Sequence, residues 1–231
     1  MSDTSNVSTA SSTPDSPKKK EFPWERVKPY RMTAVLRPLI RCICWLVFPM
    51  RVVGRENVPK KTGGVIIACN HMHAIDPVFL EIASRKDWRF MAKIELFKNK
   101  YVAFFLRHGN AFPVDRDSID RNALDFSVKV LEDGRCGLGI FPEGTRSADG
   151  VPAEGKSGVA AIARKTKADV LPCSIYYEGS LKPRKKTTIR FGEVIPFEEL
   201  GLGETPNKRK NAEATAKIMA EIKKLWAQRH D

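Results

Sequence analysis

A histidine and an aspartate stand five residues apart, where an apolar run gives way to a helical pattern. The run covers residues 65–69, and Asn-His-Met-His-Ala-Ile-Asp-Pro follows at residues 70–77. A turn here can fold the carboxylate of Asp76 back onto the imidazole of His71, which fixes the tautomer and leaves the other ring nitrogen free as a general base. Such a dyad can deprotonate a bound hydroxyl directly, without a serine or cysteine nucleophile. The simpler alternative is that Asp76 only caps the helix and His71 is a solvated turn residue.

A second cluster, Phe-Pro-Glu-Gly-Thr-Arg-Ser at residues 141–147, also follows an apolar run. It offers a glycine, a hydroxyl and a guanidinium in Gly144, Thr145 and Arg146, a combination that suits a bound phosphate. Taken alone, the cluster is also compatible with an ordinary turn that exposes an arginine.

Two weaker segments complete the set. A strand pattern in residues 109–116 delivers Arg116 at its end, and residues 170–173 are an apolar strand pattern that contains Pro172. An arginine in such a place most often pairs with a surface acid, and an apolar strand is most often plain core. Neither segment indicates a function by itself.

The elements that must position these segments alternate between strand and helix patterns. Apolar runs predict strands at residues 65–69, 88–92, 111–114, 137–141, 170–177 and 187–191. Helical periodicity predicts helices at residues 77–85, 95–107, 118–132, 157–167 and 211–229. This alternation indicates a single layered α/β domain with a largely parallel sheet flanked by helices.

Length and composition divide the 231 residues into one catalytic-size domain and an appendage. Residues 1–17 are mostly Ser, Thr, Asp and Pro and are expected to be a disordered tail. Residues 18–51 form a basic segment, and residues 52–231 form the α/β domain. The net charge of +13 favours an anionic partner: nucleic acid, an anionic membrane surface or a phosphorylated substrate.

The basic segment has the composition of an amphipathic membrane-associating helix. Nine basic residues face two acidic ones, a net charge of +7, and Trp24, Tyr30, Trp45 and Phe48 are interleaved with them. Apolar residues recur at roughly helical spacing between residues 35 and 48, so the segment can lie in a headgroup boundary. The alternative is that it packs on the domain's own core.

Several classes are not expected. No uncharged apolar stretch reaches 18 residues, so a membrane-spanning helix is not expected, and the N-terminus lacks the pattern of a secretory signal. The five cysteines form no CxxC pair and have no histidine cluster beside them. We expect reduced thiols in a cytoplasmic protein, with neither a disulfide nor a metal site.

Taken together, in this order and spacing, the four segments resemble the four blocks of the glycerolipid acyltransferase family, over roughly residues 50–200. The third block matches in full and the first is correctly placed, so the resemblance is specific. It implies that His71 and Asp76 are the catalytic pair and that Arg116 binds substrate. It also implies a substrate-binding role for Glu143, Gly144, Thr145 and Arg146, in which Glu143 organises the pocket. Supporting roles fall to Asn70, Lys93, Lys156 and Pro172.

One position departs from the family pattern. His73 stands where the family more often has Ser or Thr, which leaves the dyad intact but puts a second imidazole two residues from the first. We expect His73 to have a structural or positioning role.

The resemblance implies transfer of a fatty acyl group from acyl-CoA or acyl-acyl carrier protein to the hydroxyl of 1-acyl-sn-glycerol 3-phosphate (lysophosphatidic acid), which gives phosphatidic acid. No cofactor or metal is implied. The partners would be an anionic membrane surface and these substrates, without nucleic acid, and the protein would be peripheral on the cytoplasmic face of the membrane. Other acceptors stay open: glycerol 3-phosphate, another lysophospholipid or a lyso-aminolipid. A remote alternative is a non-enzymatic basic protein that binds membrane or nucleic acid.

Overall fold

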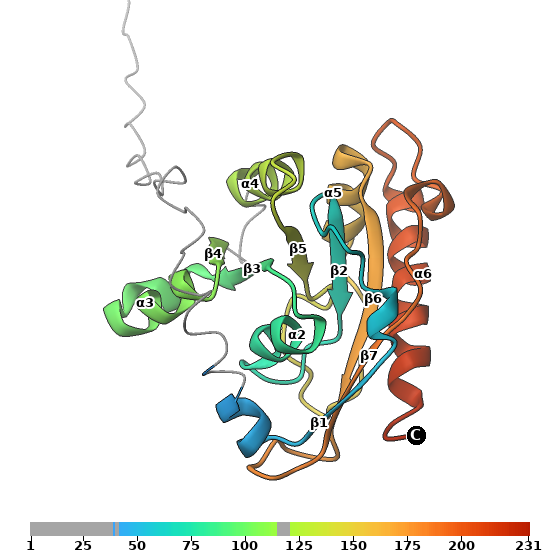
Figure 1. The fold of residues 1–231 in the computed structure, drawn as a ribbon. Coiled ribbons are helices and arrows are strands. Elements are labelled where there is room, and N and C mark those ends of the chain that lie inside the picture. Colours follow the sequence, from blue (N-terminus) through green and yellow to red (C-terminus); the bar gives the residue numbers. More distant parts are fainter. Residues whose placement is uncertain (1–38, 40–41, 115–120) are drawn as a thin grey trace, which may run out of the picture.

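A seven-stranded sheet forms the centre of the protein (Figure 1). The computed structural model describes residue 39, residues 42–114 and residues 121–231. The strand order is β1-β7-β6-β2-β5-β3-β4, and every neighbouring pair is parallel except β6 and β7. The strands are β1 (Met50–Val53), β2 (Val65–Cys69), β3 (Trp88–Lys93), β4 (Ala111–Val114), β5 (Gly137–Ile140), β6 (Asp169–Tyr176) and β7 (Thr187–Phe191).

Helices cover both faces of this sheet, which confirms the predicted layered α/β class (Figure 1). The helices are α2 (Asp76–Ser84), α3 (Lys100–His108), α4 (Arg121–Glu132), α5 (Gly158–Thr166) and α6 (Lys208–Ala227). Short 3₁₀ turns are η2 (Arg55–Asn57), η3 (Ile94–Lys98) and η4 (Phe197–Leu200). No helix among the described residues is long and apolar enough to cross a bilayer.

The central strand β2 divides the core into two apolar layers. Its five residues are all buried, and successive side chains point to opposite faces. Ile66 and Ala68 join the layer under α4, α5 and α6. Val65, Ile67 and Cys69 join the layer under α2. Asn70 and His71 therefore follow directly after a strand that is buried on both sides.

Two elements differ from the sequence-based expectation. The helix expected at residues 95–107 is divided into η3 and α3, because the Asn99 side chain caps α3 by accepting the N–H groups of Tyr101 and Val102. Strand β1 was not expected. It pairs in parallel with β7, Met50 opposite Thr187, so it runs across the boundary drawn between residues 51 and 52.

Glycines in β5 let two aromatic rings from β3 lie flat against the sheet. Trp88 and Phe90 are in register with Gly137 and Gly139. A Cβ at Gly139 would lie 2.1 Å from Cε1 of the Phe90 ring, and one at Gly137 would lie 2.3 Å from Cζ3 of Trp88. These distances are far below any real carbon contact, so the rings occupy the space that side chains would need.

We therefore predict that Gly139→Ala destabilises the fold by overpacking, by about 1–3 kcal/mol in the free energy of unfolding. Chemical denaturation of the full chain measures this change. The matched control is Gly158→Ala, since a Cβ at Gly158 meets nothing within 4 Å. Equal stability of both variants would mean that Phe90 repacks freely.

Candidate active site

The turn between β2 and α2 brings His71 and Asp76 into direct contact. His71 Nδ1 lies 2.8 Å from Asp76 Oδ2, and both side chains are buried. The same oxygen accepts the backbone N–H groups of Met72, at 2.7 Å, and His73, at 2.8 Å. Helix α2 has no side-chain cap, so the carboxylate is used on the turn and not on the helix. The geometry fits the dyad interpretation and not that of a simple helix cap.

This contact sets the protonation of the imidazole. A carboxylate oxygen that accepts two backbone N–H groups is an acceptor toward Nδ1 as well, so Nδ1 carries the proton. The other nitrogen, Nε2, then keeps its lone pair. Nε2 is therefore the ring nitrogen that can accept a proton from a bound hydroxyl.

The face of the imidazole lies against an aromatic ring from β5's carboxyl end. The rings of His71 and Phe141 are stacked, with centroids 4.1 Å apart and planes 18° apart. Phe141 in turn stacks on Phe90 at 5.8 Å. The stack on Phe141 sets the plane of the imidazole, and the stack on Phe90 holds Phe141 in place. Sequence reasoning treated Phe141 only as part of a block and gave no signal of this role.

The backbone of His71 is held by the loop at residues 141–147. Its N–H donates to Glu143 Oε1 at 2.9 Å, and its carbonyl accepts the Ser147 N–H at 2.8 Å. Glu143 Oε2 accepts the Ala153 N–H at 3.1 Å. The Glu143 residue is only 3% exposed. Both carboxylate oxygens thus bind backbone, and Glu143 joins the turn that carries His71 to the segment at Ala153.

Asn70 and Pro172 belong to the frame of the site. The Asn70 side chain donates to the Ile175 carbonyl at 3.0 Å and accepts the Ile175 N–H at 2.9 Å, which ties the end of β2 to β6. Pro172 lies within β6, opposite Ala68. Both residues therefore support the site by holding strands β2 and β6 together.

The expected phosphate-binding residues are placed in part. Gly144 has a φ of +72°, a backbone angle that residues other than glycine rarely adopt. Thr145 and Arg146 are exposed. The Lys156 side chain passes beside Gly144, with its Cδ and Nζ 3.1 and 3.2 Å from where a Cβ would be. Arg116 lies outside the described residues.

The side chains of Lys93 and His73 have partners other than the dyad. Lys93 ends β3 and forms a 3.8 Å ion pair with Glu95. The exposed ring of His73 accepts the Ile75 N–H at Nδ1, at 3.3 Å, so only the backbone of His73 reaches Asp76. The structure thus gives the two imidazoles different partners.

The Cys69 thiol, at the end of β2 two residues before His71, is held in its protonated form. Burial raises the pKa of the Cys69 thiol well above its usual value, and the neighbouring Cys173 and the charge of Asp76 act in the same direction. Because the thiolate is the reactive form, Cys69 stays a protonated thiol. All five cysteines are free. Within the described ranges, no group of three or more His, Cys, Asp and Glu residues could hold a metal ion.

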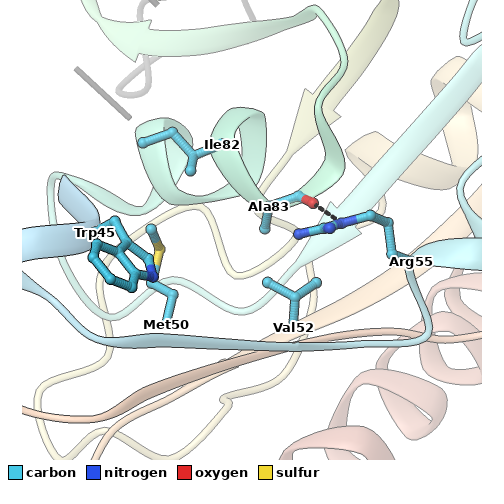
Figure 2. Close-up of a pocket in the computed structure, with 6 residues that line it drawn as sticks. All are labelled: Trp45, Met50, Val52, Arg55, Ile82 and Ala83. Atoms are coloured by element: carbon cyan, nitrogen blue, oxygen red, sulfur yellow. Dashed lines mark hydrogen bonds between the residues drawn. The ribbon is translucent and has the colours of Figure 1, made fainter. Parts of the chain in front are cut away.

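A hollow of about 270 Å³ lies at the other end of α2 from the dyad (Figure 2). The only ionic side chain in its lining is Arg55, whose Nε–H donates to the Ala83 carbonyl at 2.7 Å. Its lining is Trp45, Met50, Val52, Arg55, Ile82 and Ala83. Trp45, in a helix at residues 42–47, lines this hollow but is 66% exposed, so that helix is only partly packed on the domain.

We predict that Glu143→Gln lowers the free energy of unfolding by about 1–3 kcal/mol. A glutamine has one acceptor oxygen, so the N–H of His71 or of Ala153 loses its buried partner. Thermal or chemical unfolding measures the loss. The control is Glu154→Gln, which removes an exposed carboxylate beside Lys223 and is expected to change stability little. If Glu143→Gln left the free energy of unfolding unchanged, water would have replaced the missing acceptor.

Known proteins resemble this chain over most of the α/β domain. Residues 49–176 match the acyltransferase domain family. The 1-acyl-sn-glycerol-3-phosphate acyltransferase of Bacillus subtilis is 33% identical over 182 residues, which cover 76% of this chain and 87% of that protein. The enzyme of the same name from Streptococcus pneumoniae is 30% identical over 149 residues, which cover 63% of this chain and 55% of that one.

A solved structure agrees with the fold. The crystal structure of the 1-acyl-sn-glycerophosphate (LPA) acyltransferase PlsC from Thermotoga maritima superposes with a TM-score of 0.63 at 26% identity, over 85% of this chain and 81% of that one. The resemblance to the acyltransferase family is thereby confirmed. The chain belongs to the acyltransferase family and is an enzyme of the 1-acyl-sn-glycerol-3-phosphate acyltransferase type.

Proposed function

We propose that the enzyme transfers a fatty acyl group from a thioester to the free hydroxyl of 1-acyl-sn-glycerol 3-phosphate and so makes phosphatidic acid. The observation that carries this proposal is the 2.8 Å contact between His71 and Asp76, which leaves a basic Nε2. The names of the relatives point to the same acceptor.

The chemistry needs only the dyad and the two substrates. Nε2 of His71 takes the hydroxyl proton as the oxygen attacks the thioester carbonyl carbon. Asp76 holds the ring and stabilises the imidazolium that forms. When the tetrahedral intermediate collapses, the carbon–sulfur bond breaks, the ester remains, and the proton passes from His71 to the leaving thiolate. The reaction proceeds without an acyl-enzyme, a cofactor or a metal.

The phosphate of the acceptor is assigned to the loop at residues 141–147. Gly144 opens the backbone, Thr145 offers a hydroxyl, and Arg146 offers a guanidinium that pairs with phosphate oxygens. Lys156 lies along this loop and adds positive charge. Arg116 completes the pocket in this proposal, on the strength of its place in the second block.

The donor is a thioester of coenzyme A or of acyl carrier protein. Both donors are anionic, and the chain carries a net charge of +13. The proposal is tested by a panel of purified acceptors against both donors, with thiol release and product mass as readouts. The panel comprises lysophosphatidic acid, glycerol 3-phosphate, other lysophospholipids and a lyso-aminolipid. Product only from another acceptor would overturn it.

A peripheral position on the cytoplasmic face of a membrane belongs to the same proposal. Support comes from the described end of the basic segment, where Ile43, Trp45 and Leu46 are exposed in a helix. In the same stretch Cys44 is buried, and Phe48 packs edge-on against Phe79 of α2 at 5.4 Å. One side of this helix therefore anchors to the domain while the other offers apolar residues to lipid.

We predict that His71→Ala and Asp76→Asn each lower kcat by about 10²–10⁴-fold, since each removes the general base or its orientation. Steady-state kinetics with lysophosphatidic acid measure the loss, and circular dichroism checks the fold. His73→Ala is the control and should lose far less. A His71→Ala variant that folds and keeps more than about a tenth of the wild-type kcat would exclude His71 as the base.

We predict that Arg146→Ala raises KM for lysophosphatidic acid about ten- to a hundredfold, with a smaller effect on kcat. The reason is that a charge-assisted hydrogen bond to phosphate acts in the ground and transition states alike. Arg209→Ala, at an exposed site in α6, is the matched control. A defect confined to KM for the donor would assign Arg146 to the donor's phosphates.

A further inference from the structure

Large apolar side chains cover the outside of η3 and α3. Tyr101 and Phe105 are 68% and 73% exposed. We call the whole set the α3 surface, and its members are Ile94, Leu96, Tyr101, Val102, Phe104 and Phe105. With Leu39 and the helix at residues 42–47, this set contains nearly all the exposed large apolar residues of the described chain.

The placement of α3 is unusual for a helix that connects two parallel strands. Such a helix normally buries its apolar face on the sheet. Here α3 lies beyond the edge strand β4 (Figure 1), and among its residues 100–107 only the small Ala103, 4% exposed, is buried. The larger side chains point outward, so the α3 surface is not part of the domain's core.

Basic residues accompany the α3 surface. Residues 93–107 contain Lys93, Lys98, Lys100 and Arg107 against Glu95, a net charge of +3. The Lys100 Nζ lies 5.1 Å from the centre of the Tyr101 ring. Aromatic rings with long basic side chains beside them suit the boundary between anionic headgroups and acyl chains, where lysines reach the phosphates. The positive charge disfavours the same surface of a second copy, which would repel it.

The α3 surface begins at the carboxyl ends of the parallel strands, where the dyad also lies. Strands β2, β5 and β3 are parallel neighbours, so their carboxyl ends share one edge. His71 follows β2, Phe141 follows β5, and η3 follows β3 directly. A lipid surface that contacts η3 therefore lies on the side from which the base is approached.

We propose that the α3 surface is a second membrane-docking surface, separate from the basic N-terminal segment, and that it inserts its aromatic residues into an anionic bilayer. The reason for docking rests on the proposed function, because the acceptor is a lipid. The physical basis is independent of it: exposed aromatic and aliphatic area, a basic border, and a helix that the core does not use.

The test is binding of the full chain to vesicles, measured by co-sedimentation without donor or acceptor. Its result therefore does not depend on the reaction that the enzyme catalyses. Vesicles of phosphatidylglycerol mixed with phosphatidylcholine are compared with phosphatidylcholine alone. Tyr101→Ser combined with Phe105→Ser should lower the partition coefficient about ten- to a hundredfold. Val151→Ser, at an exposed apolar site outside the surface, should leave it unchanged.

A second pair of variants leaves the apolar side chains in place. Lys98→Gln combined with Lys100→Gln should weaken binding to the anionic vesicles about five- to thirtyfold and binding to phosphatidylcholine little. Lys208→Gln combined with Lys210→Gln, the same charge change at the start of α6, is the control and should have a smaller effect.

Two results would overturn the proposal. One is that Tyr101→Ser/Phe105→Ser binds vesicles as tightly as the wild type while Trp45→Ser/Leu46→Ser loses binding, which would leave the N-terminal helix as the anchor. The other is that sedimentation equilibrium shows a wild-type dimer that the α3 variant converts to monomer, which would make this surface an interface between copies. Activity on a short-chain, water-soluble acceptor, retained in the variants, shows that the catalytic site is intact.

Discussion

The hydrogen bond from the His71 backbone N–H to the buried carboxylate of Glu143 joins the two loops on which the site depends. A carboxylate that is almost wholly buried is tolerated only if its oxygens are bonded, and here the two N–H groups come from the turn after β2 and from the segment after residue 150. In addition, the Ser147 N–H donates a hydrogen bond to the His71 carbonyl. The base and the expected phosphate loop are therefore one rigid unit, although 72 residues separate His71 from Glu143. Catalysis by positioned groups needs this rigidity, because small displacements of a base reduce its rate strongly.

A second constraint passes from the sheet to the imidazole through aromatic packing. Gly139 leaves room for Phe90, Phe90 stacks on Phe141, and Phe141 stacks on His71. The ring plane of the base is thus set by strand register, because Phe90 stands opposite Gly139 in β3 and β5. Asp76 then fixes the rotation of the imidazole within that plane. Backbone hydrogen bonds, aromatic packing and the carboxylate restrict different motions of one side chain, so no single contact replaces another.

The parts of this arrangement that were predictable from the sequence are local ones. The contact between His71 and Asp76 spans one turn, and the buried strands before the blocks are continuous apolar runs, so spacing and periodicity suffice. The bonds of Glu143 and the stack on Phe141 join segments about seventy residues apart, and no periodicity encodes such a pairing. Strand β1 was missed because an edge strand in a basic segment lacks an apolar pattern, and the break at Asn99 was missed because a single cap interrupts an otherwise helical stretch. The outward face of α3 was hidden for a related reason, since periodicity shows that a helix has an apolar face but not what covers it.

Docking at two separate places would complete the positioning that the core begins. A single amphipathic helix ties a protein to a bilayer but leaves it free to tilt about that helix, so the base would face the membrane only part of the time. The helix at residues 42–47 rests on α2 through Phe48, whereas α3 lies by the edge strand β4, so the two apolar surfaces start from different elements of the same rigid domain. Contact at both would restrict tilt and hold the carboxyl edge of the sheet toward the headgroups. The entropy of orienting the enzyme would then be offset by membrane binding, before the acceptor enters, and the reacting hydroxyl would meet a base already in place.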